Sequence, residues 1–275
     1  MPYQNLAAFY LFFGMKKLSL LTVLFMLART CIFAQAFDPK KLESVQKESV
    51  FAPSPVKIDG KLNEWNNNFK AYNRNTRLLY ILSNDEKNMY LVVKSTDFTT
   101  KAKIIAGGVD LIVNTEGKKK DKDAPSVTFP VIEHPERLGG NISERFENRN
   151  AGVDTELMNQ LHQRTIIAAK QIRVLNIKPI TDTLISIYNT DGIKTALNFD
   201  TDGGLTLEMS IPLKYFNLTP ESTKEMAYHI VLNGFQPEWG GGPSGPGGNG
   251  GPNTLNMFDL MTPSDFWGKY SLAKK

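Results

Sequence analysis

Cysteine is almost absent from this chain, which contains one, Cys31. That residue falls in an apolar N-terminal segment that we expect to be removed, so the remaining chain has no thiol. This excludes a disulfide framework, a zinc–thiolate site and a cysteine nucleophile. A chain of this length can still bury a hydrophobic core without covalent cross-links.

Histidine is also scarce, with three residues: His134, His162 and His229. None stands at metal-ligand spacing from another or beside a nucleophile motif. The glycine-rich stretch 240–253 lacks the lysine and the following helix of a phosphate-binding loop. We therefore expect a protein that is not an enzyme.

The excess of positive charge is small and lies at the N-terminus. Lys16, Lys17 and Arg29 are the only ionised side chains before residue 37. Removing these three of 32 basic residues, and none of the 28 acidic ones, changes the formal charge from +4 to +1. A nearly neutral chain lacks the cationic field that concentrates nucleic acid, so we expect no nucleic-acid partner.

Residues 15–36 have the sequence of a Sec-type signal peptide. Two lysines precede the apolar run 18–28, and Ala34-Gln35-Ala36 provides the A-x-A pattern that signal peptidase accepts. The pattern predicts cleavage after Ala36 and export to the periplasm, the cell surface or the medium, with residues 1–14 as an upstream extension. Two alternatives stay open. One is a retained membrane anchor, favoured by the apolar run 6–13; the other is lipidation at Cys31, which Arg29 and Thr30 disfavour.

The rest of the chain has the pattern of β-strands. After a polar lead-in over 37–55, the apolar runs 78–82 and 89–93 flank six turn-forming residues, which predicts a hairpin buried on both faces. Residues 205–211 alternate apolar and polar side chains, so we expect one face in the core and one in solvent. Asp-Gly turns join this run to 183–189 and 193–199, which predicts a three-stranded meander. Further strands are predicted at 109–114, 171–177 and 228–235.

These strands predict a mainly β fold, a two-sheet antiparallel β-sandwich of jelly-roll-like type, formed by residues 56–275 as a single domain. One inserted α-helix is predicted at 154–168, with Asp154 as its N-cap. It should pack over a sheet edge or a sandwich end through a helical stripe of Leu157, Met158, Leu161, Thr165 and Ala168. Loop insertions are predicted at 115–150 and 240–253, and we expect 117–123 and 240–253 to be mobile.

A family resemblance begins at Ile58-Asp59-Gly60-Lys61-Leu62-Asn63-Glu64-Trp65. It continues through 79–81, 84–97, 109–113 and 207–212 and closes at Phe266-Trp267-Gly268-Lys269-Tyr270. These segments resemble family 9 carbohydrate-binding modules and their DOMON-like relatives over most of 56–272, apart from 115–170. The resemblance implies a non-catalytic module whose partner is a carbohydrate or glycan. It also implies aromatic side chains that stack on the sugar and polar groups from strand ends and loops that bind its hydroxyls.

The resemblance assigns a candidate site to the exit of the strand 228–235. Trp239 matches one of the family's aromatic positions, and an indole beside glycines can offer a flat apolar face to a sugar ring. Asn233, Gln236 and Glu238 would supply hydrogen-bonding groups nearby. The chain departs from the family in lacking the matching aromatic residue of the first half, and in having Gly107-Gly108 where acidic residues are usual. The alternative for Trp239 is packing back onto the sandwich. We expect Trp65 and Trp267 to be core residues.

No cofactor is predicted. The oxygen-rich sequence Asp200-Thr201-Asp202-Gly203-Gly204 lacks the distal glutamate of a calcium loop, so it predicts a plain turn. The resemblance is compatible with a structural Ca²⁺ whose ligands the sequence does not assign. We interpret Glu208 as a solvated strand residue, or one bonded to a neighbouring strand, and not as a glycosidase carboxylate. His229 is expected to be a packed or surface histidine.

Two hypotheses follow, from different classes. The first is an exported sandwich that binds a carbohydrate weakly at the loop end carrying Trp239. The second is a structural or protein-interaction module of the cell envelope without a sugar ligand, which faces a partner through the glycine-rich loop or the helix 154–168. An unrecognised hydrolase is a third and weaker reading.

Overall fold

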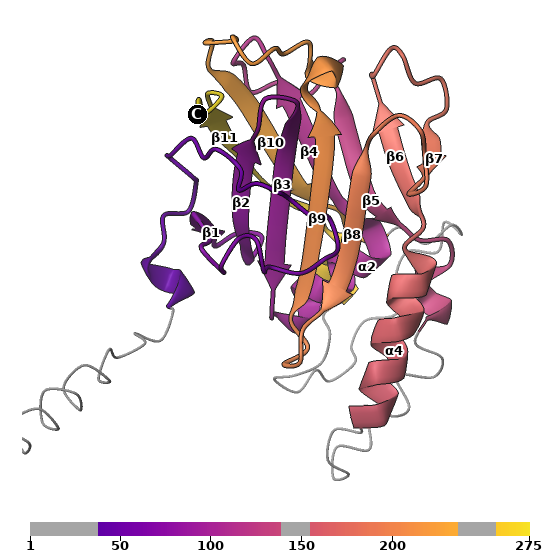
Figure 1. Cartoon of the computed structure of the whole chain (residues 1–275). Helices are drawn as coiled ribbons and strands as arrows, with labels where there is room; N and C mark the ends of the chain where they lie inside the picture. The colour runs from indigo at the N-terminus through magenta and orange to yellow at the C-terminus, as the bar shows by residue number, and fades with distance from the viewer. Residues whose placement is uncertain (1–37, 139–154, 236–256) are drawn as a thin grey trace, which may run out of the picture. The chain divides into compact units, whose positions relative to one another are not determined.

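The computed structural model describes residues 38–138, 155–235 and 257–275, and the described residues from Pro39 onward form one compact unit (Figure 1). The predicted signal segment, the capping residue Asp154 and the loop 240–253 lie outside the described residues. Within the described ranges, no helix has the length and apolar character needed to cross a bilayer.

Two antiparallel sheets make up the fold, which confirms the predicted β-sandwich. The first has the order β1-β2-β3-β9-β8, with β1 Ala71–Asn73, β2 Leu78–Asn84, β3 Asn88–Ser95, β9 Leu205–Pro212 and β8 Lys194–Phe199. The second has the order β11-β10-β4-β5-β6-β7, with β11 Ser264–Tyr270, β10 Met226–Leu232, β4 Val109–Asn114, β5 Ser126–Val131, β6 Gln171–Leu175 and β7 Leu184–Ser186. The main core lies between them and is formed by alternate side chains of both sheets.

The predicted hairpin is confirmed as β2 and β3, and every residue of β2 is buried. Its turn depends on Asp85, whose Oδ1 accepts the backbone N–H groups of Lys87 and Asn88 at 2.7 and 2.6 Å. The apolar runs on either side are buried on both faces because the first sheet has a covering layer on its outer side as well as the main core.

The covering layer corrects the prediction for β9. Its polar face was expected in solvent, yet all residues from Leu205 to Ile211 are buried. A second apolar cluster covers this outer face, formed by residues of the N-terminal segment and of β2 and β3: Ala52, Trp65, Phe69, Leu79, Ile81, Tyr90 and Val92. Apolar and polar residues do alternate along β9, but its polar face is covered by residues 52–69, which we call the covering segment and which lie about 150 residues upstream.

Glu208 anchors the covering segment and is fully buried. Its Oε2 accepts the backbone N–H groups of Asp59 and Gly60 at 2.9 and 2.7 Å, and its Oε1 accepts the indole N–H of Trp65 at 2.7 Å. Burial raises the pKa of Glu208, and the three donors oppose this rise. The expectation of a solvated carboxylate was therefore wrong, and a carboxylate so enclosed cannot reach a glycosidic bond.

The tight turn at Gly60 needs glycine for two reasons. Its φ is +75°, and an added Cβ would stand 2.6 Å from the Cβ of Asn198 on the edge strand β8. The resemblance motif that starts at Ile58 is thus a packing motif in this chain, joining the covering segment to β8 and β9.

The polar lead-in also docks on the first sheet. The side chain of Gln46 exchanges two hydrogen bonds with the backbone of Leu82, at 2.7 and 2.9 Å, beyond the end of the short strand β1. The backbone N–H of Gln46 donates to the hydroxyl of Tyr80 at 2.7 Å. That hydroxyl lies 2.8 Å from the hydroxyl of Tyr228 in the second sheet, so the contact links the lead-in to both layers.

The predicted three-stranded meander is confirmed for two of its strands and was wrong for the third, 183–189. β8 pairs with β9 as expected, but β7 pairs with β6 at the edge of the second sheet. The chain between β7 and β8 therefore passes from one sheet to the other, with Gly192 in the left-handed region at φ +85°.

The predicted helix is present as α4, Thr155–Ala168, and it packs against the edge strand β8. His162 stacks on Phe199 with ring centroids 3.8 Å apart, but of the predicted stripe only Thr165 is fully buried. Two further helices were not predicted: α2, Phe98–Gly107, and α5, Met257–Met261. The fold thus has three α-helices in its described part, where one was expected.

Candidate functional site

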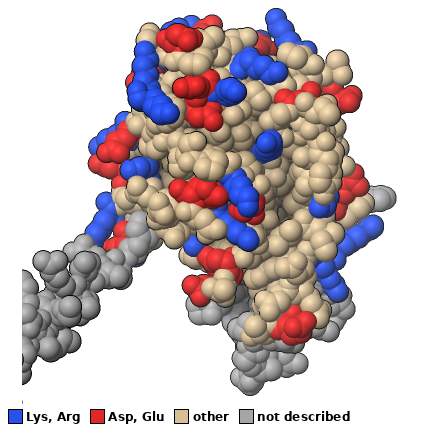
Figure 2. Space-filling model, in the orientation of Figure 1, with Lys and Arg blue, Asp and Glu red and all other residues tan. Residues whose placement is uncertain are grey.

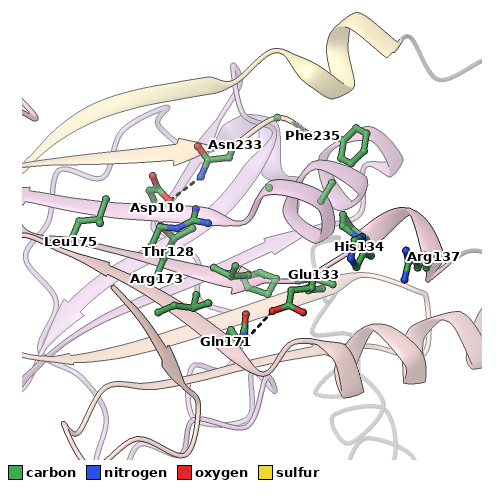
Figure 3. Close-up of a pocket in the computed structure, with 18 residues that line it drawn as sticks. Asp110, Thr128, Glu133, His134, Arg137, Gln171, Arg173, Leu175, Asn233 and Phe235 are labelled. Atoms are coloured by element: carbon green, nitrogen blue, oxygen red, sulfur yellow. Dashed lines mark hydrogen bonds between the residues drawn. The ribbon is translucent and has the colours of Figure 1, made fainter. Parts of the chain in front are cut away.

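A hollow of about 670 Å³ lies on the outer face of the second sheet, and we call it the trough (Figure 3). Side chains alternate along a strand, so Val109 and Leu111 enter the core while Asp110 points outward. The strand register sets Asp110 opposite Thr128, and Thr128 opposite Arg173. These three polar side chains form a row across β4, β5 and β6.

One part of the trough is built around Asp110. Asn233, just beyond β10, donates its side-chain N–H to Oδ1 of Asp110 at 2.9 Å and its backbone N–H to the carbonyl of Gly108 at 3.1 Å. Burial raises the pKa of Asp110, while hydrogen bonds from Thr128 and Asn233 act in the opposite direction. The carboxyl group is therefore half-buried and already bonded to the protein.

Glycines bring the wall of this part close to the strand exit. A Cβ on Gly107, at the end of α2, would stand 2.7 Å from the carbonyl oxygen of Gly234 and 2.8 Å from the Cβ of Asn233. Gly108 has φ +77°, which favours glycine. Gly107-Gly108, which stands where the resembling family carries acidic residues, is required here by close backbone packing.

The other part of the trough is formed by the chain after β5 and by the start of β6. Its lining includes Glu133, His134, Gln171 and Arg137, the last from the short 3₁₀-helix η2 (Pro135–Arg137). Gln171 donates its side-chain N–H to Oε1 of Glu133 at a long 3.4 Å. Its Oε1 is buried and has no hydrogen-bond partner within the described ranges. The trough therefore has an acceptor that no donor of the described residues satisfies.

A second hollow of about 430 Å³ adjoins the trough and shares Glu133, His134 and Arg137 with it. It extends to α4, where Arg164 and Ile167 line it. The two hollows together therefore offer a longer surface than the trough alone.

Apolar side chains complete the lining. Leu175 and Leu184 are each 41% exposed on neighbouring strands, and Phe235 leaves the strand exit with its backbone N–H bonded to the carbonyl of Leu260 at 2.9 Å. Figure 3 shows Leu175 and Phe235 toward opposite ends of the hollow. The trough thus combines hydrogen-bonding groups with exposed apolar carbon atoms.

Of the four predicted ligand residues, Asn233 lines the trough. Gln236, Glu238 and Trp239 lie outside the described residues, so their roles stay predictions. The sequence analysis missed Thr128, Gln171 and Arg173. A signal for them existed, since each is a polar residue that alternates with buried apolar residues in a short strand.

The two other tryptophans differ. Trp65 is 5% exposed, as expected for a core residue. The prediction of a core position for Trp267 was wrong. Its side chain is half-buried on the outer face of β11 and stacks on His229, with ring centroids 4.2 Å apart and an interplanar angle of 10°. His229 is buried between Asp121 and Asp265, with ring nitrogens 2.9 and 2.7 Å from their carboxylates.

The oxygen-rich sequence at Asp200 is a turn, as predicted. Oδ1 of Asp200 accepts the backbone N–H groups of Asp202 and Gly204 at 3.0 and 2.7 Å, and Oδ2 pairs with Lys94 at 2.7 Å. No group of histidine and acidic residues with metal-ligand geometry occurs in the described part of the chain.

Comparisons with known proteins identify no family for this chain. No protein-family model and no curated protein matches the chain. One similar solved structure is a family 9 carbohydrate-binding module from Caldicellulosiruptor kristjanssonii in complex with glucose, 12% identical over 83% of this chain and 96% of that one, with a TM-score of 0.34. The resemblance to DOMON-like sandwiches gains no support from it.

Proposed function

We propose that this chain is an exported, non-catalytic β-sandwich that binds carbohydrate in the trough. One observation carries the proposal: a solvent-open hollow lined by hydrogen-bonding side chains from adjacent strands, with a buried acceptor, Gln171 Oε1, that has no donor among the described residues. An unpaired buried acceptor costs free energy, which a hydroxyl donor would recover. Sugars supply such hydroxyl groups in a close array.

The trough also suits a sugar in size. Pockets of roughly 300–1,000 Å³ hold compact organic ligands, and the trough falls within this range. In the proposed complex, Gln171 and Thr128 each accept a hydrogen bond from a hydroxyl group of the sugar. Leu175, Leu184 and Phe235 contact the C–H faces of the sugar.

Trp239 keeps its proposed role as a stacking residue. It follows Phe235 by four residues, and four residues of extended chain span at most about 14 Å. An indole placed there can reach a ligand in the trough and add a larger apolar face than Phe235 offers.

The absence of catalysis is part of the proposal. Glu208, a carboxylate considered for glycoside hydrolysis, is enclosed beneath the covering segment. In the trough, Asp110 is bonded to Asn233, which suits a positioning role more than proton transfer. Export rests on the signal-peptide pattern of residues 15–36.

Isothermal titration calorimetry tests the proposal with the chain from residue 37, which contains the whole compact unit. We expect heat of binding with at least one oligosaccharide from a panel of neutral and acidic sugars, and no sugar hydrolysis over the same period. Thr128→Val and Gln171→Leu should weaken binding, each by about fivefold or more, the worth of one hydrogen bond to a ligand. Thr96→Val, at an exposed threonine next to the first sheet, is the matched control and should bind as the parent chain does.

The rival hypothesis is an envelope module without a sugar ligand. It predicts silence across the oligosaccharide panel, together with a specific envelope protein that is retained by the chain and not displaced by sugars. That pair of results would refute carbohydrate binding.

A further inference from the structure

The arginines of this protein gather at the proposed site. The structure describes five, and three of them line the trough or the adjoining hollow: Arg137, Arg164 and Arg173. Among the described residues no lysine lines either hollow, although lysines are far more numerous than arginines in the chain. The face in Figure 2, over the first sheet, instead carries both signs of charge interspersed. The concentration of guanidinium groups is therefore a property of the site.

The two arginines outside the site are engaged by the protein. Arg77 pairs with Asp97 at 3.0 Å, and Arg74 donates to the carbonyl of Lys40 at 3.0 Å. By contrast, Arg164 and Arg173 are exposed and form no ion pair with any residue of the described ranges. Their donors face solvent at the site.

The carboxylates of the site do not use up these donors. Asp110 is bonded to Asn233 at 2.9 Å, and Glu133 accepts from Gln171 at 3.4 Å. The positive charge of Arg173 lowers the pKa of Asp110, but the two side chains do not form an ion pair. Within the described residues, the two hollows are thus lined by three guanidinium groups and two carboxylates, and neither Arg164 nor Arg173 is paired with either carboxylate.

Two needs of the site point to one kind of ligand. Guanidinium groups bind carboxylate and sulfate oxygens through paired, charge-assisted hydrogen bonds. Oε1 of Gln171, which has no donor among the described residues, can accept a hydrogen bond from a hydroxyl group of a ligand. Resting on the proposed function, we propose that the trough and the adjoining hollow bind an acidic glycan. Its carboxylate or sulfate groups are held by Arg173 and Arg164, and one of its hydroxyl groups donates to Gln171.

The ligand is a chain of sugars and not a single one. Arg173 on β6 lines the trough, Arg164 on α4 lines the adjoining hollow, and neither arginine lines both. A ligand that meets both guanidinium groups must extend through both hollows. Because the formal charge after signal removal is only +1, the preference for anions is local to the site.

Calorimetry with two chemically matched ligands tests this proposal. Tetragalacturonate and its methyl ester carry the same ring hydroxyl groups, and only the former carries charge. We expect the acid to bind at least about tenfold more tightly than the ester, the worth of one charge-assisted pair. Chondroitin tetrasaccharides with and without sulfate, titrated in parallel, carry the same carboxylates, so a difference in affinity between them reports the contribution of sulfate.

Variants then assign the effect to residues. Arg173→Gln and Arg164→Gln should each lower affinity for the acid by about tenfold and leave affinity for the ester unchanged. Arg173→Lys keeps the charge without the planar fork and should recover part of the loss. Arg74→Gln, an arginine away from the site, is the matched control. Because the two site arginines are exposed, circular dichroism should show unchanged folding.

The outcomes separate the two proposals. Equal binding of acid and ester, or unchanged acid binding in both glutamine variants, would overturn the acidic-glycan inference while the proposed carbohydrate function stands. If no sugar of any charge binds, both fail. Binding of a single-stranded oligonucleotide in preference to every glycan would also overturn the inference.

Discussion

The hydrogen bond between Trp65 and Glu208 joins the covering segment to the centre of β9 at 2.7 Å, and its energy can be measured by a double-mutant cycle. The cycle uses Trp65→Phe, Glu208→Gln and both together. Trp65→Phe removes the indole donor and some apolar volume. Glu208→Gln keeps the shape of the side chain but can accept through one oxygen only.

The geometry sets the expected magnitudes. In Glu208→Gln, the amide oxygen can accept the backbone N–H groups of Asp59 and Gly60, but the amide NH₂ then faces the indole N–H of Trp65. Loss of a hydrogen bond to a charged group should cost about 1.5–3 kcal/mol of unfolding free energy. Trp65→Phe should cost about 2–4 kcal/mol, because it adds a cavity to the same loss. The double variant should lose about 1–2 kcal/mol less than the sum.

Urea denaturation followed by circular dichroism measures each corner of the cycle. In a chain of this size, each kcal/mol corresponds to about 2–4 °C in Tm. Trp267→Phe is the matched control, since Trp267 stacks on His229 in the other sheet and should be additive with Glu208→Gln. An additive result for Trp65 and Glu208, or a stabilising effect of Glu208→Gln, would refute the reasoning that this carboxylate fastens the covering segment.

Three further predictions follow from single contacts. Burial lowers the pKa of His162, which stacks on Phe199, so this residue stabilises the docking of α4 at pH values above about 6.5, and the stability is lost as the pH falls through the lowered pKa. Amide exchange in α4, corrected for its intrinsic pH dependence, should rise below pH 6 in the parent chain and stay flat in His162→Phe. Gly60→Ala should lower the unfolding free energy by about 1–3 kcal/mol, because φ is +75° and the new Cβ would stand 2.6 Å from that of Asn198. Urea denaturation measures this loss, and an unchanged midpoint would contradict the close packing at Gly60. Burial raises the pKa of Tyr80 to about 12, so the contribution of this residue to stability is intact below about pH 10 and is lost as the pH rises toward 12. The unfolding free energy of Tyr80→Phe should therefore fall less steeply between about pH 10 and 12 than that of the parent chain. Equal slopes for the two proteins would show that Tyr80 does not cause the alkaline loss.

Strands, turns and one helix could be predicted because their signals are local. The predicted strand 109–114 coincides with β4, and the predicted helix 154–168 differs from α4 by one residue. α2 was missed because its sequence has no continuous apolar stripe; of its residues, only Thr100, Lys103 and Ile104 are buried. β5 was missed because it lies within 115–150, where apolar and turn-forming residues mix without a period.

The site was harder to predict than the fold. Asn233 was identified, but its bonded partner Asp110 lies 123 residues away in the sequence. Thr128 and Arg173 come into one row with Asp110 only through the register of three strands. No spacing within the chain encodes that alignment, since a shift of one residue in one strand would turn its polar side chains into the core.

The sequence by itself determined most of the extended segments, their turns and the polar residues within them, because backbone preferences and side-chain alternation act over a few residues. Tertiary structure alone decided which polar face is covered and which stays open. Glu208 and Arg173 are both polar residues in apolar strands, yet the first is sealed beneath Trp65 and the second faces solvent at the trough. The difference comes from a distant segment that packs over one sheet and leaves this part of the other uncovered.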